Sequence, residues 1–163
     1  MTNNAPAPTS RPSDSERFAG VVAELRKGRG DILRDWVYRV RENRSVQSKQ
    51  ELSDPLLLDH VPQLFDSVLD RLEHGSPRFE SEQLAAIHGF QRRADGYDVT
   101  EAVLELFMFR RAIWGHLSAT EQRRSSAYLV MEMIDGLLDR AVMASLESFL
   151  DPGARTLNRR SIP

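Results

Sequence analysis

Apolar residues recur along most of this chain every three or four positions, which is the spacing of one face of an α-helix. The pattern starts at Phe18, weakens at Gly28 and Gly30, and continues to Val40, so this stretch is predicted to be one kinked helix or two. Residues 43–53 are polar and predict a loop. No stretch alternates apolar and polar residues as a half-buried β-strand does. The predicted fold class is therefore all-α.

Residues that start and stop helices divide the remainder of the chain. Asp54-Pro55 is a good helix start, but Pro62 interrupts it, so the main helix is predicted to run from Pro62 to Gly75. Three further helices are predicted, over residues 79–94, 98–117 and 121–150. The second of them begins with Asp98-Val99-Thr100-Glu101, which has the spacing of a capping box. Together these segments predict a single-domain bundle of about five helices.

The chain has 163 residues, which is enough for one domain with a substantial core. Residues 1–13 are rich in Pro, Asn, Ser and Thr, offer little to bury, and are expected to be disordered. The helical domain is expected to occupy residues 14–150. Asp151-Pro152-Gly153 is a stop signal, and residues 151–163 are expected to form a flexible basic tail.

Charge and composition exclude several classes of function. The formal net charge is −2, from 22 basic and 24 acidic residues, so the chain has no overall field that would hold a nucleic acid. No apolar run reaches the roughly 18 residues that a membrane span needs. The chain has no Cys, and therefore neither disulfides nor a thiolate metal site. A cytoplasmic protein that binds neither nucleic acid nor membrane is expected.

The predicted helix over residues 98–117 is apolar on nearly every side and is expected to lie in the centre of the bundle. It nevertheless carries Glu105, which has no cation three or four positions away on its own helix. A buried carboxylate needs a partner. Across the turn at Gly96, His88 and Arg92 of the preceding helix are expected at about the same height as Glu105. Arg can donate two hydrogen bonds to one carboxylate. We therefore predict a cluster of His88, Arg92 and Glu105.

Two interpretations of this cluster are open. In the first, the three side chains fix how two helices pack against each other. In the second, they bind a small anion or sense pH through His88, whose ordinary pKa is near 6.5. Nearby polar and aromatic residues are secondary candidates for such a site: Arg93, Arg110 and Trp114.

No motif in the sequence dictates a reaction. No nucleophile elbow, phosphate-binding glycine loop or paired carboxylates stand out, so no catalytic residue is predicted. The histidines lack the spacing of a helical metal pair, and no metal or cofactor is expected. His60 and His88 lie on successive helical segments, a weak sign of haem binding. The aromatic residues of helix 98–117 are better explained as core packing than as a cofactor pocket.

Several motifs occur in an order that is similar to a known family. They are Ile32-Leu33…Trp36…Val40; Leu57-Leu58-Asp59-His60-Val61-Pro62…Leu64-Phe65; His88…Arg92…Gly96-Tyr97-Asp98; and Glu105…Arg110-Arg111…Ile113. The chain resembles the N-terminal domain of the RsbT co-antagonist group (the RsbRD type), an input module also found ahead of bacterial sensor kinases. The resemblance covers about residues 18–150. It departs from the family where an aromatic residue commonly follows the glutamate, because Leu106 and then Phe107 follow Glu105 here.

The resemblance implies a sensory or regulatory helical domain, globin-like without haem, in bacterial stress-response or two-component signalling. It also implies a homodimer that acts through a partner in trans, such as a kinase, a phosphatase or a STAS-type protein. The long helix over residues 121–150 has one broad apolar face and can pair with its twin, which agrees with dimerisation. The alternative is a small-ligand or haem-binding helical sensor that uses His88, Arg92 and Glu105.

Overall fold

The computed structural model describes residues 14–75, 79–119 and 124–151, and the described residues are helical without any β-strand. The elements are α1 (Asp14–Lys27), α2 (Arg29–Glu42), the 3-10 helix η1 (Ser48–Glu51), α3 (Asp54–Leu58), α4 (Val61–His74), α5 (Phe79–Ala94), α6 (Val99–Ala119) and α7 (Arg124–Leu150). The all-α prediction is confirmed. The two predicted tails, apart from Asp151, and the predicted start of the last helix at 121–123 lie outside the described residues.

The first apolar stretch forms two helices that break at Gly28. Hydrogen bonds from Gly28 N to Glu24 O and from Ile32 N to Gly28 O span the break, so the chain kinks there without forming a loop. A Cβ atom at Gly28 would lie 2.2 Å from the imidazole ring of His116 on α6. Glycine at this position therefore lets the end of α6 pack against the junction of α1 and α2.

Proline and glycine set the other boundaries as the sequence predicted. Pro55 and Pro62 stand in the first turns of α3 and α4. Gly75 ends α4 with a φ of 65°, and Gly96 forms the turn between α5 and α6 with a φ of 82°, a left-handed conformation that favours glycine. Asp59 has a φ of 37° between α3 and α4, a strained value for a residue that carries a Cβ.

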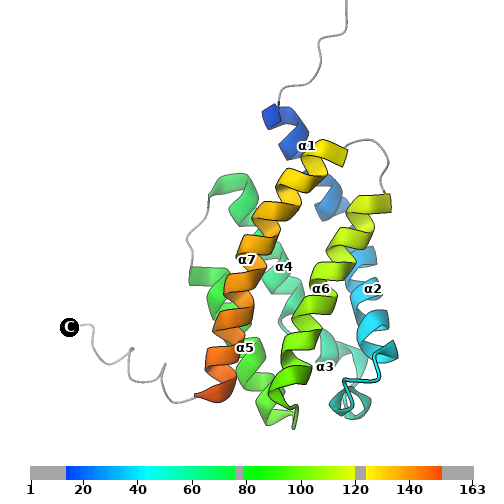
Figure 1. The fold of residues 1–163 in the computed structure, drawn as a ribbon, viewed down its shortest axis with the longest axis vertical. Helices are drawn as coiled ribbons and strands as arrows, with labels where there is room; N and C mark the ends of the chain where they lie inside the picture. The colour runs from blue at the N-terminus through cyan, green and yellow to red at the C-terminus, as the bar shows by residue number, and fades with distance from the viewer. Residues whose placement is uncertain (1–13, 76–78, 120–123, 152–163) are drawn as a thin grey trace, which may run out of the picture.

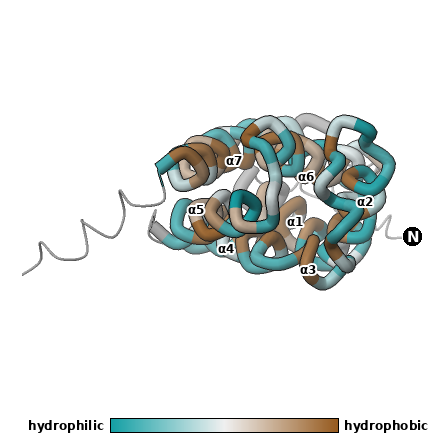
Figure 2. Tube along the Cα trace, turned by 90° about the horizontal axis from the view of Figure 1, so that it is seen from below, coloured by the Kyte–Doolittle hydropathy of each residue, from teal (hydrophilic) through white to brown (hydrophobic). Residues whose placement is uncertain are grey.

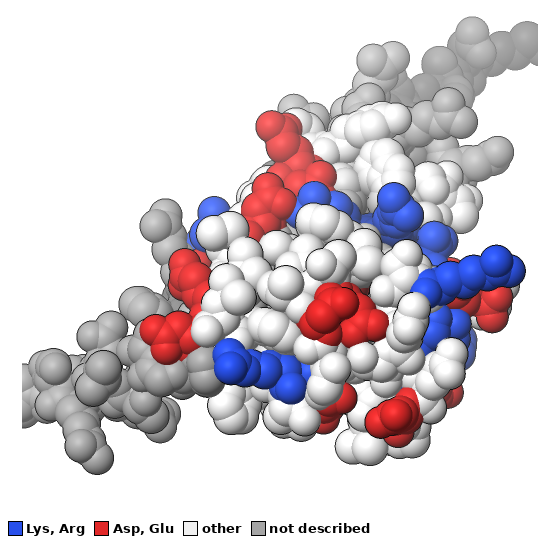
Figure 3. Space-filling view, turned by 60° about the horizontal axis from the view of Figure 1, so that its bottom comes forward, with Lys and Arg blue, Asp and Glu red and all other residues white. Residues whose placement is uncertain are grey.

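The helices pack around the antiparallel pair formed by α6 and α7. In Figure 1, α2 lies beside α6, α5 lies beside α7, and α4 lies behind them. Seen from below, α7 and α6 form one layer over α5 and α4, and hydrophobic residues line the space between the layers (Figure 2). Acidic and basic side chains are interspersed over the lower end of the molecule (Figure 3), in keeping with the net charge of −2.

The backbones of α5 and α7 approach each other closely at Gly89. A Cβ atom at Gly89 would lie 2.0 Å from the carbonyl oxygen of Ser145, so only glycine permits this contact. The centre of the core is aromatic. Trp36 of α2 and Phe65 of α4 both meet Phe109 of α6 edge to face, at centroid distances of 6.4 and 5.3 Å.

The expectation that α6 is covered on all sides is wrong for one face. The side chains of Phe107 and Trp114 are 42% and 36% exposed, because none of the described helices covers the outer side of α6. The Phe107 ring lies under the guanidinium of Arg110 at 5.8 Å, and Trp114 contacts Tyr128 of α7 with ring centroids 5.3 Å apart. An apolar outer surface therefore remains on the α6–α7 pair.

Candidate functional site

The predicted capping box at the start of α6 forms in full. Asp98 Oδ1 accepts a hydrogen bond from the Glu101 amide at 2.8 Å, and Glu101 Oε2 accepts one from the Asp98 amide at 3.0 Å. Glu101 also accepts hydrogen bonds from the amides of Gln47 and Ser48 and from the Ser48 hydroxyl. Burial would raise the pKa of Glu101, but these hydrogen bonds outweigh it and hold the pKa below its ordinary value. One carboxylate thus joins η1 to α6.

One turn further along α6, Glu105 forms a buried ion pair with Arg92 of α5. Arg92 Nε lies 2.7 Å from Glu105 Oε2, and both side chains are 0% exposed. The carboxylate of Glu105 raises the pKa of Arg92 against the effect of burial, so the guanidinium remains charged. The partner predicted for the isolated carboxylate is therefore the arginine across the Gly96 turn.

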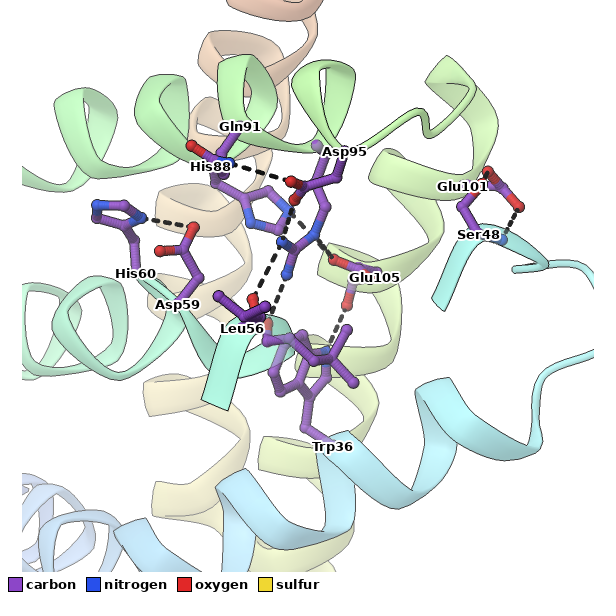
Figure 4. A network of polar contacts seen from close by, with 12 residues as sticks. Trp36, Ser48, Leu56, Asp59, His60, His88, Gln91, Asp95, Glu101 and Glu105 are labelled. Atoms are coloured by element: carbon purple, nitrogen blue, oxygen red, sulfur yellow. Dashed lines mark hydrogen bonds and ion pairs between the residues drawn. The ribbon is translucent and has the colours of Figure 1, made fainter. Parts of the chain in front are cut away.

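The remaining donors of Arg92 reach the end of α3. Nη2 donates to the carbonyl of Leu57 at 2.5 Å, and Nη1 donates to Leu56 O at 3.4 Å and to Asp95 Oδ2 at 3.2 Å. The guanidinium also stacks over the Tyr97 ring, 5.3 Å from its centroid. A single side chain of α5 therefore holds α3, the Gly96 turn and α6 together. Figure 4 shows three residues that it contacts, Leu56, Asp95 and Glu105.

His88 completes the predicted trio but is not an ionic partner. Its Nε2 lies 3.5 Å from Glu105 Oε2, and the side chain is 1% exposed. Burial, and then the charge of Arg92, lower the pKa of His88 to about 3, although the backbone of Ala102 opposes the shift. The imidazole is therefore neutral near pH 7. This lowered pKa disfavours protonation of His88 between pH 5.5 and 8 and so gives no support to the pH-sensing interpretation.

The backbone of Glu105 is fixed as firmly as its side chain. Trp36 Nε1 of α2 donates to the Glu105 carbonyl at 2.9 Å, which joins α2 to the same point on α6 (Figure 4). Sequence reasoning did not assign Trp36 or Tyr97 to the cluster. The available signal was that both belong to the family motifs, and buried Trp and Tyr usually need a polar partner.

The secondary candidates lie outside the cluster. Arg93 donates to the carbonyl of Phe149 at 2.7 Å and so caps the end of α7. Arg110 pairs with Asp135 and Asp139 of α7, and Trp114 lies at the surface. His60, the other residue considered for haem, has its Nδ1 2.7 Å from the carboxylate of its neighbour Asp59. These four residues and the trio do not form one site.

The cluster of His88, Arg92 and Glu105 is closed, since none of its members is more than 1% exposed. The trio therefore presents no surface to a ligand. Its evident effect is to lock α2, α3, α5 and α6 into one packing. The fold and this cluster define a small helical domain whose packing is fixed by a buried ion pair.

Comparison with known families identifies the domain more closely. The chain belongs to the family described as the RsbT co-antagonist protein rsbRD N-terminal domain, whose model matches residues 30–161. The family assignment made from the motifs is confirmed, and it makes this chain a regulatory module of stress-response signalling. No curated protein and no solved structure matches the chain. Among the described residues, no helix has the length and apolar character needed to cross a bilayer.

Proposed function

We propose that this domain is a non-catalytic signalling module that works as a homodimer and transmits its state to a partner protein. The observation that carries the proposal is the apolar outer surface of α6 and α7, here called the α6–α7 face. It consists of exposed large apolar side chains: Phe107, Trp114, Tyr128, Leu129, Met133, Met143 and Leu150. The five on α7 are each at least half exposed. Exposed large apolar side chains gathered on two adjacent helices are typical of an interaction site, and charged residues such as Glu132, Asp139 and Glu147 are exposed on α7 beside them.

A second copy of the chain fits this face best. Because α6 and α7 are adjacent and antiparallel, two copies related by a twofold axis would bring four helices together. The methionines Met133 and Met143 are flexible enough to fit an interface that changes its packing. A small shift of the paired helices could then reach a kinase, phosphatase or STAS-type protein in trans. The proposal keeps the cytoplasmic location expected from the sequence.

The alternative sensor function gains no support from the geometry. A haem or small ligand at His88, Arg92 and Glu105 would need an opening to side chains that are at most 1% exposed. Opening the cluster would also separate a buried ion pair, which typically costs several kcal/mol.

Sedimentation equilibrium of wild type and Met143→Glu tests the proposal. The wild-type protein is expected to be a dimer, and the variant a monomer, because a carboxylate would be buried without a partner in the interface. Tyr38→Glu is the matched control, since Tyr38 is an exposed apolar residue on α2, outside the α6–α7 face. This control should remain dimeric. A wild-type protein that is monomeric at the highest attainable concentration would refute the proposed dimer.

A further inference from the structure

A hollow with basic side chains lies between the end of α2 and η1, apart from the buried cluster. Its volume is about 400 Å³, and its lining consists of Arg41, Glu42, Arg44, Val46, Gln47, Lys49 and Gln50. This volume lies within the range of small-molecule sites, about 300–1,000 Å³. In Figure 3, Lys and Arg side chains project at the right-hand edge of the lower end, on the side of the molecule where Figure 1 places α2.

The charges of this hollow do not balance. Three cations and the single carboxylate of Glu42 line it, and Arg41 is paired with Asp54 outside the lining, which leaves Arg44 and Lys49 against one carboxylate. Arg41 is engaged in holding the loop, because it binds Asp54 at 2.7 Å, the Leu52 carbonyl at 2.6 Å and the Lys49 carbonyl. Arg44 forms neither a hydrogen bond nor an ion pair with any described residue. Its guanidinium is free to bind a ligand.

Lys49 is the decisive residue. Its side chain is 5% exposed, and its hydrogen-bond partner among the described residues is the neutral carbonyl of Asn43. That contact caps the end of α2, but it uses one of three N–H donors. No carboxylate in the described part of the chain forms an ion pair with this ammonium group, and burial lowers its pKa. The charges of Glu42 and Glu101 act on Lys49 and oppose this shift without forming an ion pair, and an anion in direct contact would offset the cost of burial further.

The rest of the lining suits a polar organic ligand. The side-chain amides of Gln47 and Gln50 form no hydrogen bond with the described residues, so they can bind hydroxyl groups. The backbone amides of Gln47 and Ser48 are taken up by Glu101 and cannot hold an anion. The ligand is therefore bound by side chains rather than by backbone amides.

We propose that this hollow binds a small molecule that carries a phosphate group and hydroxyls, in the manner of a sugar phosphate. Lys49 and Arg44 bind the phosphate, and Gln47 and Gln50 bind the hydroxyls. A phosphate monoester carries a charge between about −1.5 and −2 at pH 7 and three acceptor oxygens, so Lys49 and Arg44 can bind it together. The effect of ligand binding is transmitted to α6 through Glu101, which accepts hydrogen bonds from the backbone at the start of η1, at the edge of the hollow.

Titration of the ¹⁵N-labelled protein with ribose 5-phosphate, followed by the amide resonances, tests this site. Amides of residues 41–50 should shift, and ribose alone should cause much smaller changes. Arg44→Gln should weaken binding about tenfold, the loss of one hydrogen-bonded charge. Lys49→Met should weaken it further. Arg34→Gln is the control, because Arg34 is an exposed arginine of α2 that pairs with Asp31 and does not line the hollow.

Three outcomes would overturn the site: no shift in residues 41–50, equal binding by Arg44→Gln, or equal weakening by Arg34→Gln. Arg44→Gln removes no contact among the described residues, so it tests binding even if Lys49→Met fails to fold. Phosphatidylglycerol vesicles provide a second arm, and binding to them in preference to ribose 5-phosphate would assign the phosphate to a lipid. Met143→Glu should retain the site, because the hollow shares no residue with the α6–α7 face. The sedimentation experiment can therefore refute the dimer without affecting the phosphate site, and the titration can refute the phosphate site without affecting the dimer.

Discussion

Arg92 and Glu105 form an ion pair in which neither side chain touches solvent, and it joins α5 to α6 across the Gly96 turn. The two residues are thirteen positions apart in the sequence. The remaining donors of Arg92 also hold the carbonyls of Leu56 and Leu57, so loss of Arg92 would leave several buried polar groups without partners. Loss of Glu105 would leave the guanidinium without its counterion. The pair therefore determines the packing of three helices.

Replacement of Glu105 by Ala should destabilise the domain by about 3–5 kcal/mol, because it leaves the buried guanidinium without a counterion. Urea denaturation followed by circular dichroism measures the change. Asp139→Ala is the control, since it removes a carboxylate that pairs with Arg110 near the surface. This control should change the stability little. If both substitutions changed the free energy of unfolding equally, burial of the Arg92–Glu105 pair would not contribute to stability.

The depressed pKa of His88 predicts that acid weakens the fold. Below pH 6.5 the unfolded chain binds a proton at this imidazole, whereas the folded protein does so only near its pKa of about 3. The free energy of unfolding should therefore fall as the pH decreases from about 6.5 towards 3, by roughly 1 kcal/mol per pH unit from this residue. His88→Gln should remove that part of the slope in urea denaturation measured from pH 7 to 4.5.

His74→Gln is the control for this titration. The His74 side chain is 69% exposed, so this variant should keep the wild-type dependence on pH. A slope that is the same in wild type and His88→Gln would mean that other groups dominate the acid response.

Two neighbouring glycines should respond in opposite ways to substitution by Ala. Gly28→Ala should destabilise the domain by about 1–3 kcal/mol, because the new Cβ collides with the His116 ring. Gly30→Ala should stabilise it by about 0.5–1 kcal/mol, since a Cβ there meets only Arg34 at 3.5 Å and Ala favours helix. Thermal unfolding measures both changes, and the double variant Gly28→Ala/His116→Ala should recover part of the loss. Stabilisation by Gly28→Ala would contradict the packing described at this junction.

The capping box predicts a smaller and more local effect. Asp98→Ala should cost about 1 kcal/mol, because the Glu101 amide would lose the acceptor that starts α6. Amide hydrogen exchange in the first turn of α6 should become faster in this variant. Thr100→Ala, at an exposed neighbouring position, is the control and should leave that exchange unchanged. A similar acceleration in both variants would point to general fraying of the helix.

The sequence was sufficient to predict the helices and the central pair. Proline, glycine and the capping box set their boundaries locally, and Glu105 required a cation that only the preceding helix offered nearby. The contacts of Arg92 with the Leu56 and Leu57 carbonyls were not predictable, because any residue can present a backbone acceptor. The position of α3 beside α5 depends on tertiary packing rather than on a local pattern.

Phe107 and Trp114 show a second limit of sequence reasoning. Both fit an apolar helix, and periodicity alone assigned them to the core, yet they lie on the outer side of α6. A residue that packs inside a domain and one that is available to a second protein have the same hydropathy. The distinction becomes visible only when the other helices are in place.

The contact of Gly89 with the Ser145 carbonyl restricts how the bundle can move. The Cβ position of Gly89 meets both the carbonyl and the hydroxyl of Ser145, so the two helices are in direct contact there. Travel of α7 along its axis would therefore carry α5 with it, including His88, which immediately precedes Gly89 in the chain. A displacement of α7 caused by contact at its outer surface would therefore move α5, and with it the buried charged residues, as a rigid body.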